Sequence, residues 1–199
     1  MDNKKPDDFS PQESLRLISS MIETTRNSVK DSSHYFLLWG WAVMIACAIQ
    51  YYLTVFAGSD KNYYGWYIIP VALVFHVYFI VRDRKREKVK TYINEAGAHL
   101  WTAIGLSFFA TSFLFGKTGW EHSSPIYMML YGIGTYVSGS LIKFRPLIIG
   151  GLLCFPLIVL SSFAGDNMQI VLLAVAILVS YIIPGHLLRA KFKNQQEHV

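Results

Sequence analysis

Six long apolar blocks, separated by short polar segments, constrain this chain more than any other feature of its sequence. A helix needs roughly 20 apolar residues to cross the hydrocarbon layer of a membrane. The chain is 53% hydrophobic and only 16% charged, whereas soluble domains carry about 25% charged residues. The sequence therefore predicts an all-α, integral membrane bundle of about six transmembrane helices. They form one domain, 34–188, with spans at 35–56, 63–81, 96–116, 125–142, 146–164 and 168–188.

The fourth and fifth blocks are short, and the segment between them leaves an alternative open. Lys143, Arg145 and Pro146 separate the two blocks. A proline cannot continue a helix without losing a backbone hydrogen bond. Two separate spans are the first interpretation, and a single long re-entrant unit is the second.

The basic residues are distributed very unevenly between the segments that connect the blocks. Sixteen of the 18 lysines and arginines fall in the N-terminal segment 1–33, the loop 82–90, the loop after the fourth block and the tail 189–199. With six spans, all of these segments lie on one side of the membrane. Because positively charged segments stay in the cytoplasm, we expect the N-terminus, the C-terminus and the basic tail to be cytoplasmic. The same reasoning assigns the positive charge to membrane topology and not to nucleic-acid binding.

The segment before the first block has the pattern of an amphipathic helix. Ser10 and Glu13 can form a capping box, with Pro11 at the first helical position. Apolar residues then recur every three or four positions through 11–31, with charged residues between them, as in a helix that lies on a membrane or a partner. We expect the apolar face of this helix to form an interaction surface. It includes Leu15, Ile18 and Ile22.

The loop 82–90 carries the densest run of charge in the chain. A run of this kind fixes topology, and it can also bind anionic lipid or dock a partner protein in the cytoplasm. Together with helix 11–31, it is the second predicted interaction segment. Its candidate contact residues are Arg82, Arg84, Lys85 and Arg86.

Few ionisable residues fall inside the apolar blocks, and such residues are often functional. His76 lies in the second block and His99 in the third, and Glu95 precedes His99 by one helical turn. The functional hypothesis is a metal, haem or proton site near the cytoplasmic face. The alternative is that each side chain only bonds to a neighbouring helix or to water. No metal-ligand spacing or catalytic motif is present, so the sequence predicts no catalytic residue, metal or cofactor.

Small residues cluster in the fourth block, where Gly134 and Ser138 are one helical turn apart. This spacing lets two helices approach closely, either within the chain or in a homo-oligomer. Prolines in the other blocks, at Pro70, Pro156 and Pro184, are expected to kink their spans. Broken helices also occur at the binding sites of transporters.

The stretch from Glu13 to Leu53, with the motif Leu37-Leu38-Trp39-Gly40-Trp41, resembles a family of uncharacterised polytopic membrane proteins from Bacteroidetes-type bacteria. That resemblance implies a bacterial inner-membrane location and supplies no activity. The first functional hypothesis is a non-catalytic regulatory, accessory or scaffold component of that membrane. The alternative is a small transporter or channel. A membrane enzyme or a haem or metal protein that uses His76 and His99 is the third.

Overall fold

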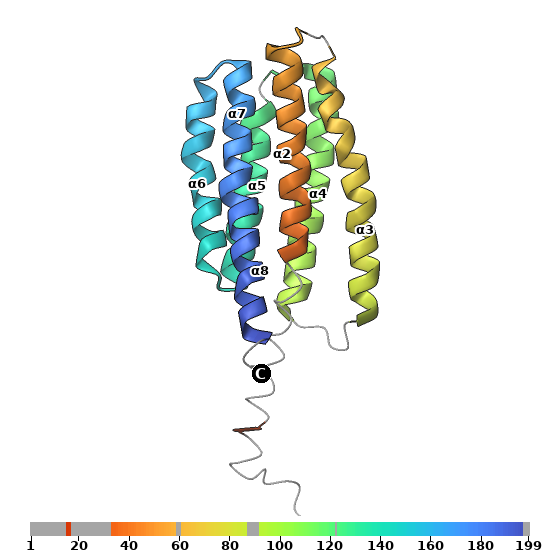
Figure 1. The fold of residues 1–199 in the computed structure, drawn as a ribbon, viewed down its shortest axis with the longest axis vertical. Coiled ribbons are helices and arrows are strands. Elements are labelled where there is room, and N and C mark those ends of the chain that lie inside the picture. Colours follow the sequence, from red (N-terminus) through yellow and green to blue (C-terminus); the bar gives the residue numbers. More distant parts are fainter. Residues whose placement is uncertain (1–14, 17–32, 59–60, 87–91, 122, 197–199) are drawn as a thin grey trace, which may run out of the picture.

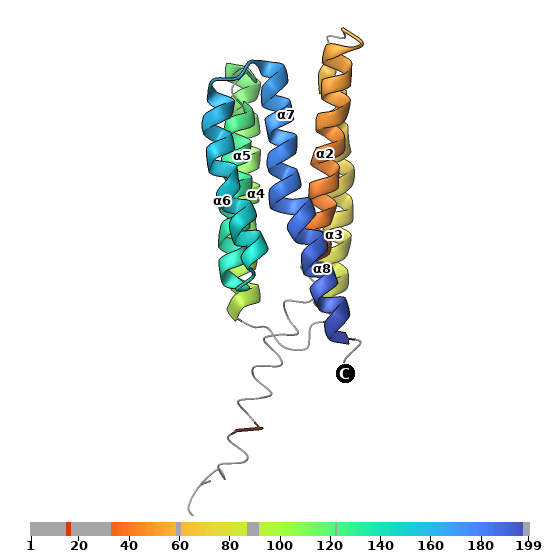
Figure 2. The same cartoon turned by 60° about the vertical axis from the view of Figure 1, so that its left-hand side comes forward.

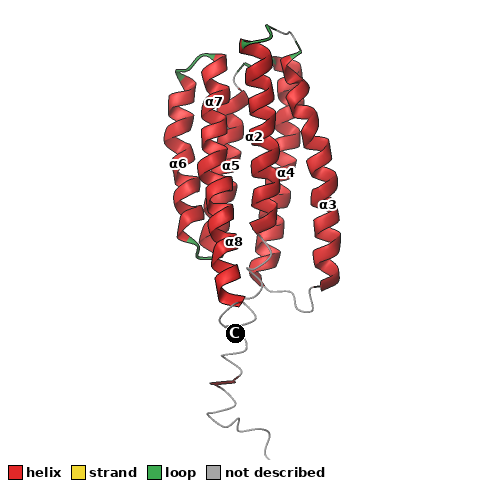
Figure 3. Ribbon diagram, viewed as in Figure 1, coloured by secondary structure: helices red, strands yellow, loops and turns green. Residues whose placement is uncertain are grey.

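The computed structural model describes residues 15–16, 33–58, 61–86, 92–121 and 123–196, and these residues form a bundle of helices without strands. Figure 3 shows the helices joined by short loops. The all-α architecture expected from the sequence is confirmed for this part of the chain. The first four helices are α2 (Ser33–Val55), α3 (Ile68–Arg86), α4 (Tyr92–Thr118) and α5 (Ser123–Leu141). The later elements are α6 (Arg145–Ser162), α7 (Asp166–Ile177), the π-helix η3 (Leu178–Ile182) and α8 (Ile183–Gln196).

These elements make six roughly parallel rods, because α7, η3 and α8 follow one another without a break (Figure 1). A short 3-10 helix, η2 (Asn62–Tyr67), leads directly into α3. Successive rods run in opposite directions, so the loops alternate between the two ends of the bundle. We call the end that holds the α5–α6 turn and the end of α8 the basic end. The lysines and arginines of α3, the α5–α6 turn and α8 all lie there, whereas Lys61 and Lys117 lie at the opposite end.

Five of the six rods are long and apolar enough to cross a membrane. The exception is α5, whose composition is diluted by glycine, serine, threonine and tyrosine. It is also a well-enclosed helix, in contact with α4, α6 and α7. The described part of the chain thus has six rods but five candidate spans, so the predicted count of about six spans is matched only roughly. α5 and α6 are separate rods, as the first interpretation of that region required.

The contact between α5 and α6 is the most extensive in the described bundle, and glycines allow it. A Cβ atom built on Gly151 of α6 would lie 2.5 Å from the backbone nitrogen of Tyr136, and one on Gly139 of α5 would lie 2.7 Å from that of Ile148. These distances are far below ordinary van der Waals contact. The two helices can therefore approach this closely only because side chains are absent at the seam.

The last rod packs against the first. A Cβ on Gly40 of α2 would lie 2.9 Å from the side chain of Ile182, and one on Gly185 would lie 3.0 Å from Leu37. Figure 2 shows α2 and α3 on one side of the bundle, α4, α5 and α6 on the other, and the last rod between them. α2 thus reaches the rest of the molecule mainly through the C-terminal rod.

The π-helix places Tyr181 at the centre of the core. Its side chain is 1% exposed, and its ring contacts those of Phe36, Trp101 and Tyr131 at centroid distances of 5.5, 6.2 and 5.3 Å. These edge-to-face contacts join α2, α4 and α5 to the last rod. This π-helix lies directly before Pro184, which cannot donate a helical hydrogen bond. The kink expected at Pro184 stays a prediction.

Most of the predicted amphipathic helix 11–31 lies outside the described residues. Leu15 and Arg16 are described, and both are helical and exposed. Ile18 and Ile22 are not among the described residues, so the interaction surface assigned to them remains a prediction.

Candidate functional site

A cluster of polar and aromatic side chains joins α2 to α3 near the basic end, and it centres on Asp83. Its carboxylate oxygen Oδ2 lies 3.0 Å from Nε2 of His34 and accepts a hydrogen bond of 2.9 Å from the hydroxyl of Tyr35. The other oxygen, Oδ1, lies 3.3 Å from Nε of Arg82. Both oxygens of a carboxylate that is only 16% exposed therefore have donors.

A second interaction lies two helical turns further along α3, away from the basic end. The indole Nε1 of Trp39 donates a hydrogen bond of 3.2 Å to Nδ1 of His76. In a neutral imidazole the nitrogen that accepts cannot carry the proton, so the proton of His76 lies on Nε2. His76 also contacts the ring of Tyr35 at 5.2 Å, which connects this interaction to the Asp83 cluster. We call the whole set the α2–α3 network: His34, Tyr35, Trp39, His76, Arg82 and Asp83.

Helical periodicity explains why these residues meet. Tyr35 and Trp39 are four positions apart on α2, and His76 and Asp83 are seven apart on α3, so each pair lies on one face of its helix. At the opposite end, Trp66 of η2 donates a hydrogen bond of 2.7 Å to the side-chain oxygen of Gln50. η2 and α3 are thus bonded to α2 at three positions along the bundle: at Trp66, His76 and Asp83.

These attachments matter because α3 has few other contacts. It packs on α2 and η2, while much of its apolar surface, including Val74, Phe75 and Tyr78, is exposed. Hydrogen bonds between side chains of neighbouring helices add to the attraction between them. The network therefore fixes the position and rotation of an otherwise peripheral helix.

The network consists of side-chain hydrogen bonds and ion pairs within and between the two helices. Asp83 interacts with His34, Tyr35 and Arg82, and His76 accepts a hydrogen bond from Trp39. In the described part of the chain, no three histidine, cysteine or acidic side chains are grouped so that they could hold a metal ion. The arrangement is suited to attaching one helix to another and to holding charge at the end of the bundle.

The structure separates the three residues that the sequence grouped as an intramembrane site. His76 belongs to the network on α3. His99 and Glu95 are exposed on α4, and neither contacts the network among the residues that can be described. α3 and α4 are consecutive in the chain, but each packs mainly on another helix: α3 on α2, and α4 on α5.

Of the four candidate contact residues predicted in the loop 82–90, Arg82 belongs to the network. Lys85 is exposed, and the side chains of Arg84 and Arg86 lie outside the described set. Tyr35, Trp39 and Asp83 were not among the site residues predicted from the sequence. The sequence offered one indication for Asp83: it is an acidic residue between two arginines, and it follows His76 by seven positions, which places both on one helical face.

Gly134 and Ser138 are used for packing inside the chain. A Cβ on Gly134 would lie 3.0 Å from Ile104 and 3.2 Å from Trp101, both on α4. Ser138 is also buried. Within the described structure, neither residue is on the surface where a second copy of the chain could reach it.

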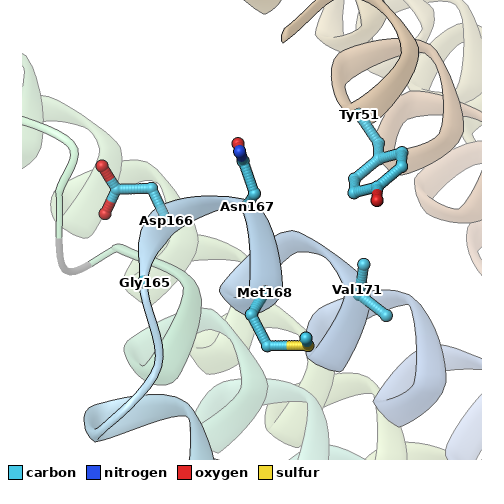
Figure 4. Close-up of a pocket in the computed structure, with 6 residues that line it drawn as sticks. All are labelled: Tyr51, Gly165, Asp166, Asn167, Met168 and Val171. Carbon is cyan, nitrogen blue, oxygen red and sulfur yellow. The ribbon is translucent and has the colours of Figure 1, made fainter. Parts of the chain in front are cut away.

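A shallow, open hollow of about 460 Å³ lies at the end of the bundle opposite the network (Figure 4). The ring of Tyr51 faces it from α2, while Met168 and Val171 line it from α7. Asp166 supplies its charged group, and in Figure 4 that carboxylate points away from Tyr51. The hollow therefore shares no residue with the candidate site.

In comparisons with known proteins, no family model matches the chain, and neither a curated protein nor a solved structure is significantly similar to it.

Proposed function

We propose that the chain is a multi-pass integral membrane protein whose N-terminus and C-terminus are both cytoplasmic. Five rods of sufficient length and apolarity support this proposal, as do the many exposed apolar side chains of α3 and α4. The remaining rod, α5, tolerates its polar residues because neighbouring helices enclose it. The basic end faces the cytoplasm, in accord with the rule that positive segments stay inside. The proposed bacterial inner-membrane location rests on the sequence resemblance alone.

Labelling with a membrane-impermeant maleimide tests this topology in intact cells. The two native cysteines, Cys47 and Cys154, are buried, so the unmodified chain serves as the unlabelled control. We expect Lys117→Cys to be labelled directly and Lys193→Cys only after the membrane is made permeable. The reverse pattern would refute the orientation, and labelling of both positions in intact cells would refute the number of spans.

Within the membrane, we propose a non-catalytic role as a regulatory, accessory or scaffold component. One observation carries this proposal: the bond between His34 and Asp83 holds together the places where the two predicted interaction segments join the bundle. Segment 11–31 ends just before α2, and loop 82–90 begins at the end of α3. A partner at the basic end could therefore contact both segments at once, which strengthens binding through high effective concentration.

Affinity purification in mild detergent, followed by mass spectrometry, tests this role. We expect a stoichiometric partner that is lost when residues 11–31 are deleted and weakened by Asp83→Asn, which removes the charge that joins the two segments. Asp166→Asn, at the opposite end of the bundle, is the matched control and should retain the partner. A purified chain without any partner, or a partner unaffected by the deletion, would refute the proposal.

A second candidate, a small transporter or channel, is favoured by the π-helix within the last rod. The π-helix precedes Pro184, and the buried hydroxyls of Tyr181 and Thr135 both lack a hydrogen-bond partner among the described residues. π-Helical turns occur frequently at functional sites. Solute flux into proteoliposomes that disappears with Tyr181→Phe and with His76→Ala would support transport. Flux equal to that of empty vesicles, across ions and small polar solutes, would argue against it.

A further inference from the structure

The turn between α5 and α6 contains a lysine where helix termination favours glycine. Phe144 N–H donates to the carbonyl of Gly139 at 2.9 Å, and Lys143 N–H donates to that of Ser140 at 3.3 Å. This is the hydrogen-bond pattern of a Schellman motif, in which the residue equivalent to Lys143 adopts a left-handed conformation and is usually glycine. Lys143 has a φ of 52°. Lys143 therefore occupies a position where any side chain costs conformational energy relative to glycine.

Two further cations are placed at the same corner. Arg145 begins α6, and Lys191 of α8 holds its ammonium group 5.3 Å from the centre of the Phe144 ring. Phe144 itself is buried and lies between Lys143 and Arg145 in the chain, so Lys191 lies close to the turn that carries both of them. We call Lys143, Arg145 and Lys191 the basic corner.

The basic corner carries uncompensated positive charge. The ion pairs of the described structure are those of Asp83 with His34 and Arg82, at α2 and α3. Lys143, Arg145 and Lys191 are all exposed, and no described carboxylate lies within ion-pair distance of them. An anion is the chemical complement of this surface.

Each of the two helices at the corner continues into an exposed apolar stripe. On α6, Ile149 and Leu152 follow Arg145 by four and seven positions, and on α8, Leu187 and Ile183 precede Lys191 by four and eight. At the helical period, each stripe lies on the same face as its cation. All four apolar side chains are exposed. The surface is thus cationic at the basic end and apolar along the bundle, which is the polarity of a phospholipid.

We propose that the basic corner binds the phosphate headgroup of an anionic phospholipid, whose acyl chains lie along the stripes of α6 and α8. The proposal rests on the membrane location proposed above and is independent of the accessory role. A glycerophospholipid with net negative charge fits the three unpaired cations, whereas a zwitterionic lipid would bring its own positive charge to them.

Binding can be measured on the purified full-length protein by native mass spectrometry after exchange into micelles containing phosphatidylglycerol or phosphatidylcholine. The variant Lys143→Gly/Lys191→Gln removes two cations from the corner and gives the turn its preferred residue, so it should fold. The matched control, Lys85→Gln/Lys193→Gln, removes two positive charges from the same end outside the corner. Each lysine beside an anionic lipid strengthens binding about fivefold, so the corner variant should bind phosphatidylglycerol about 25-fold more weakly than the wild type.

The result that supports the proposal is selective retention of phosphatidylglycerol by the wild type and the control, with loss in the corner variant. Equal retention of the two lipids by the wild type, or equal losses in the corner and control variants, would overturn it. Flotation of the wild-type chain with phosphatidylcholine vesicles tests the membrane location separately. A chain that does not float refutes the membrane location, and a chain that floats without lipid preference refutes only the basic corner.

Discussion

Replacement of Gly151 by alanine probes the seam between α5 and α6 most directly. The added Cβ would lie 2.5 Å from the nitrogen and 2.8 Å from the Cα of Tyr136, and 2.9 Å from the carbonyl oxygen of Gly132. All three atoms belong to the backbone of α5, so no side-chain rotation can relieve the clash. Ordinary contact begins at 3.4 Å, and the helices would have to separate by about 0.9 Å.

The cost of that separation follows from the contacts along the rest of the seam. A gap of 0.5–1 Å removes about a quarter to a half of the dispersion energy of each atom pair that is pulled apart. Insertion of a methyl group into a well-packed interior typically costs about 1–3 kcal/mol. We expect Gly151→Ala to lie at the upper end of this range, because the obstructing atoms are backbone atoms.

Thermal or denaturant unfolding of the purified protein in mild detergent measures the effect. The matched control is Gly105→Ala on α4, where an added Cβ would meet no atom within 4 Å. This control should be neutral or slightly stabilising, because alanine is the better helix former. Unfolding of Gly151→Ala at the wild-type midpoint, or an equal loss in the control, would refute the close α5–α6 contact.

The turn and the α2–α3 network give further expectations for the same unfolding assay. Lys143→Gly should raise the free energy of unfolding by about 1 kcal/mol in detergent without anionic lipid, because glycine adopts the left-handed conformation without strain; a lower midpoint would contradict this account of the turn. Asp83→Asn should lower it by about 1 kcal/mol, since the charge that binds His34 is lost, and an unchanged midpoint would show that the network is not stabilising. Trp39→Phe, which deletes only the donor to His76, should lower it by about 0.6 kcal/mol, and a gain in stability would refute a role for that hydrogen bond.

Hydropathy was sufficient to predict the helices, because a long apolar run has few alternatives to helical structure. It was not sufficient to predict which helices are neighbours, since helix order and rotation depend on packing and not on apolarity. His76 and His99 illustrate the difference. They lie on consecutive helices of similar composition, but α3 packs on α2, so the two histidines do not form one site.

The glycine pattern was informative in a similarly partial way. The small residues of the fourth block indicated a close helix contact, and Gly134 does make one, with α4. Sequence alone could not distinguish this contact from one with a second chain. Asp83 could not be predicted for another reason. A carboxylate in a run of basic residues is expected to be solvated, and the structure alone shows that His34 and Tyr35 bond to it.

The contact between α2 and the last rod has a consequence for the synthesis of the protein. α2 is the first helix of the bundle to emerge from the ribosome, and Gly40, which permits its close contact, faces Tyr181 and Ile182 near the end of the chain. Domains are made from the N-terminus onward at about 5–20 residues per second. The last rod, on which α2 packs, is therefore synthesised several seconds after the hairpin of α2 and α3. During that interval, the hydrogen bonds between α2 and α3 are the contacts available to this hairpin.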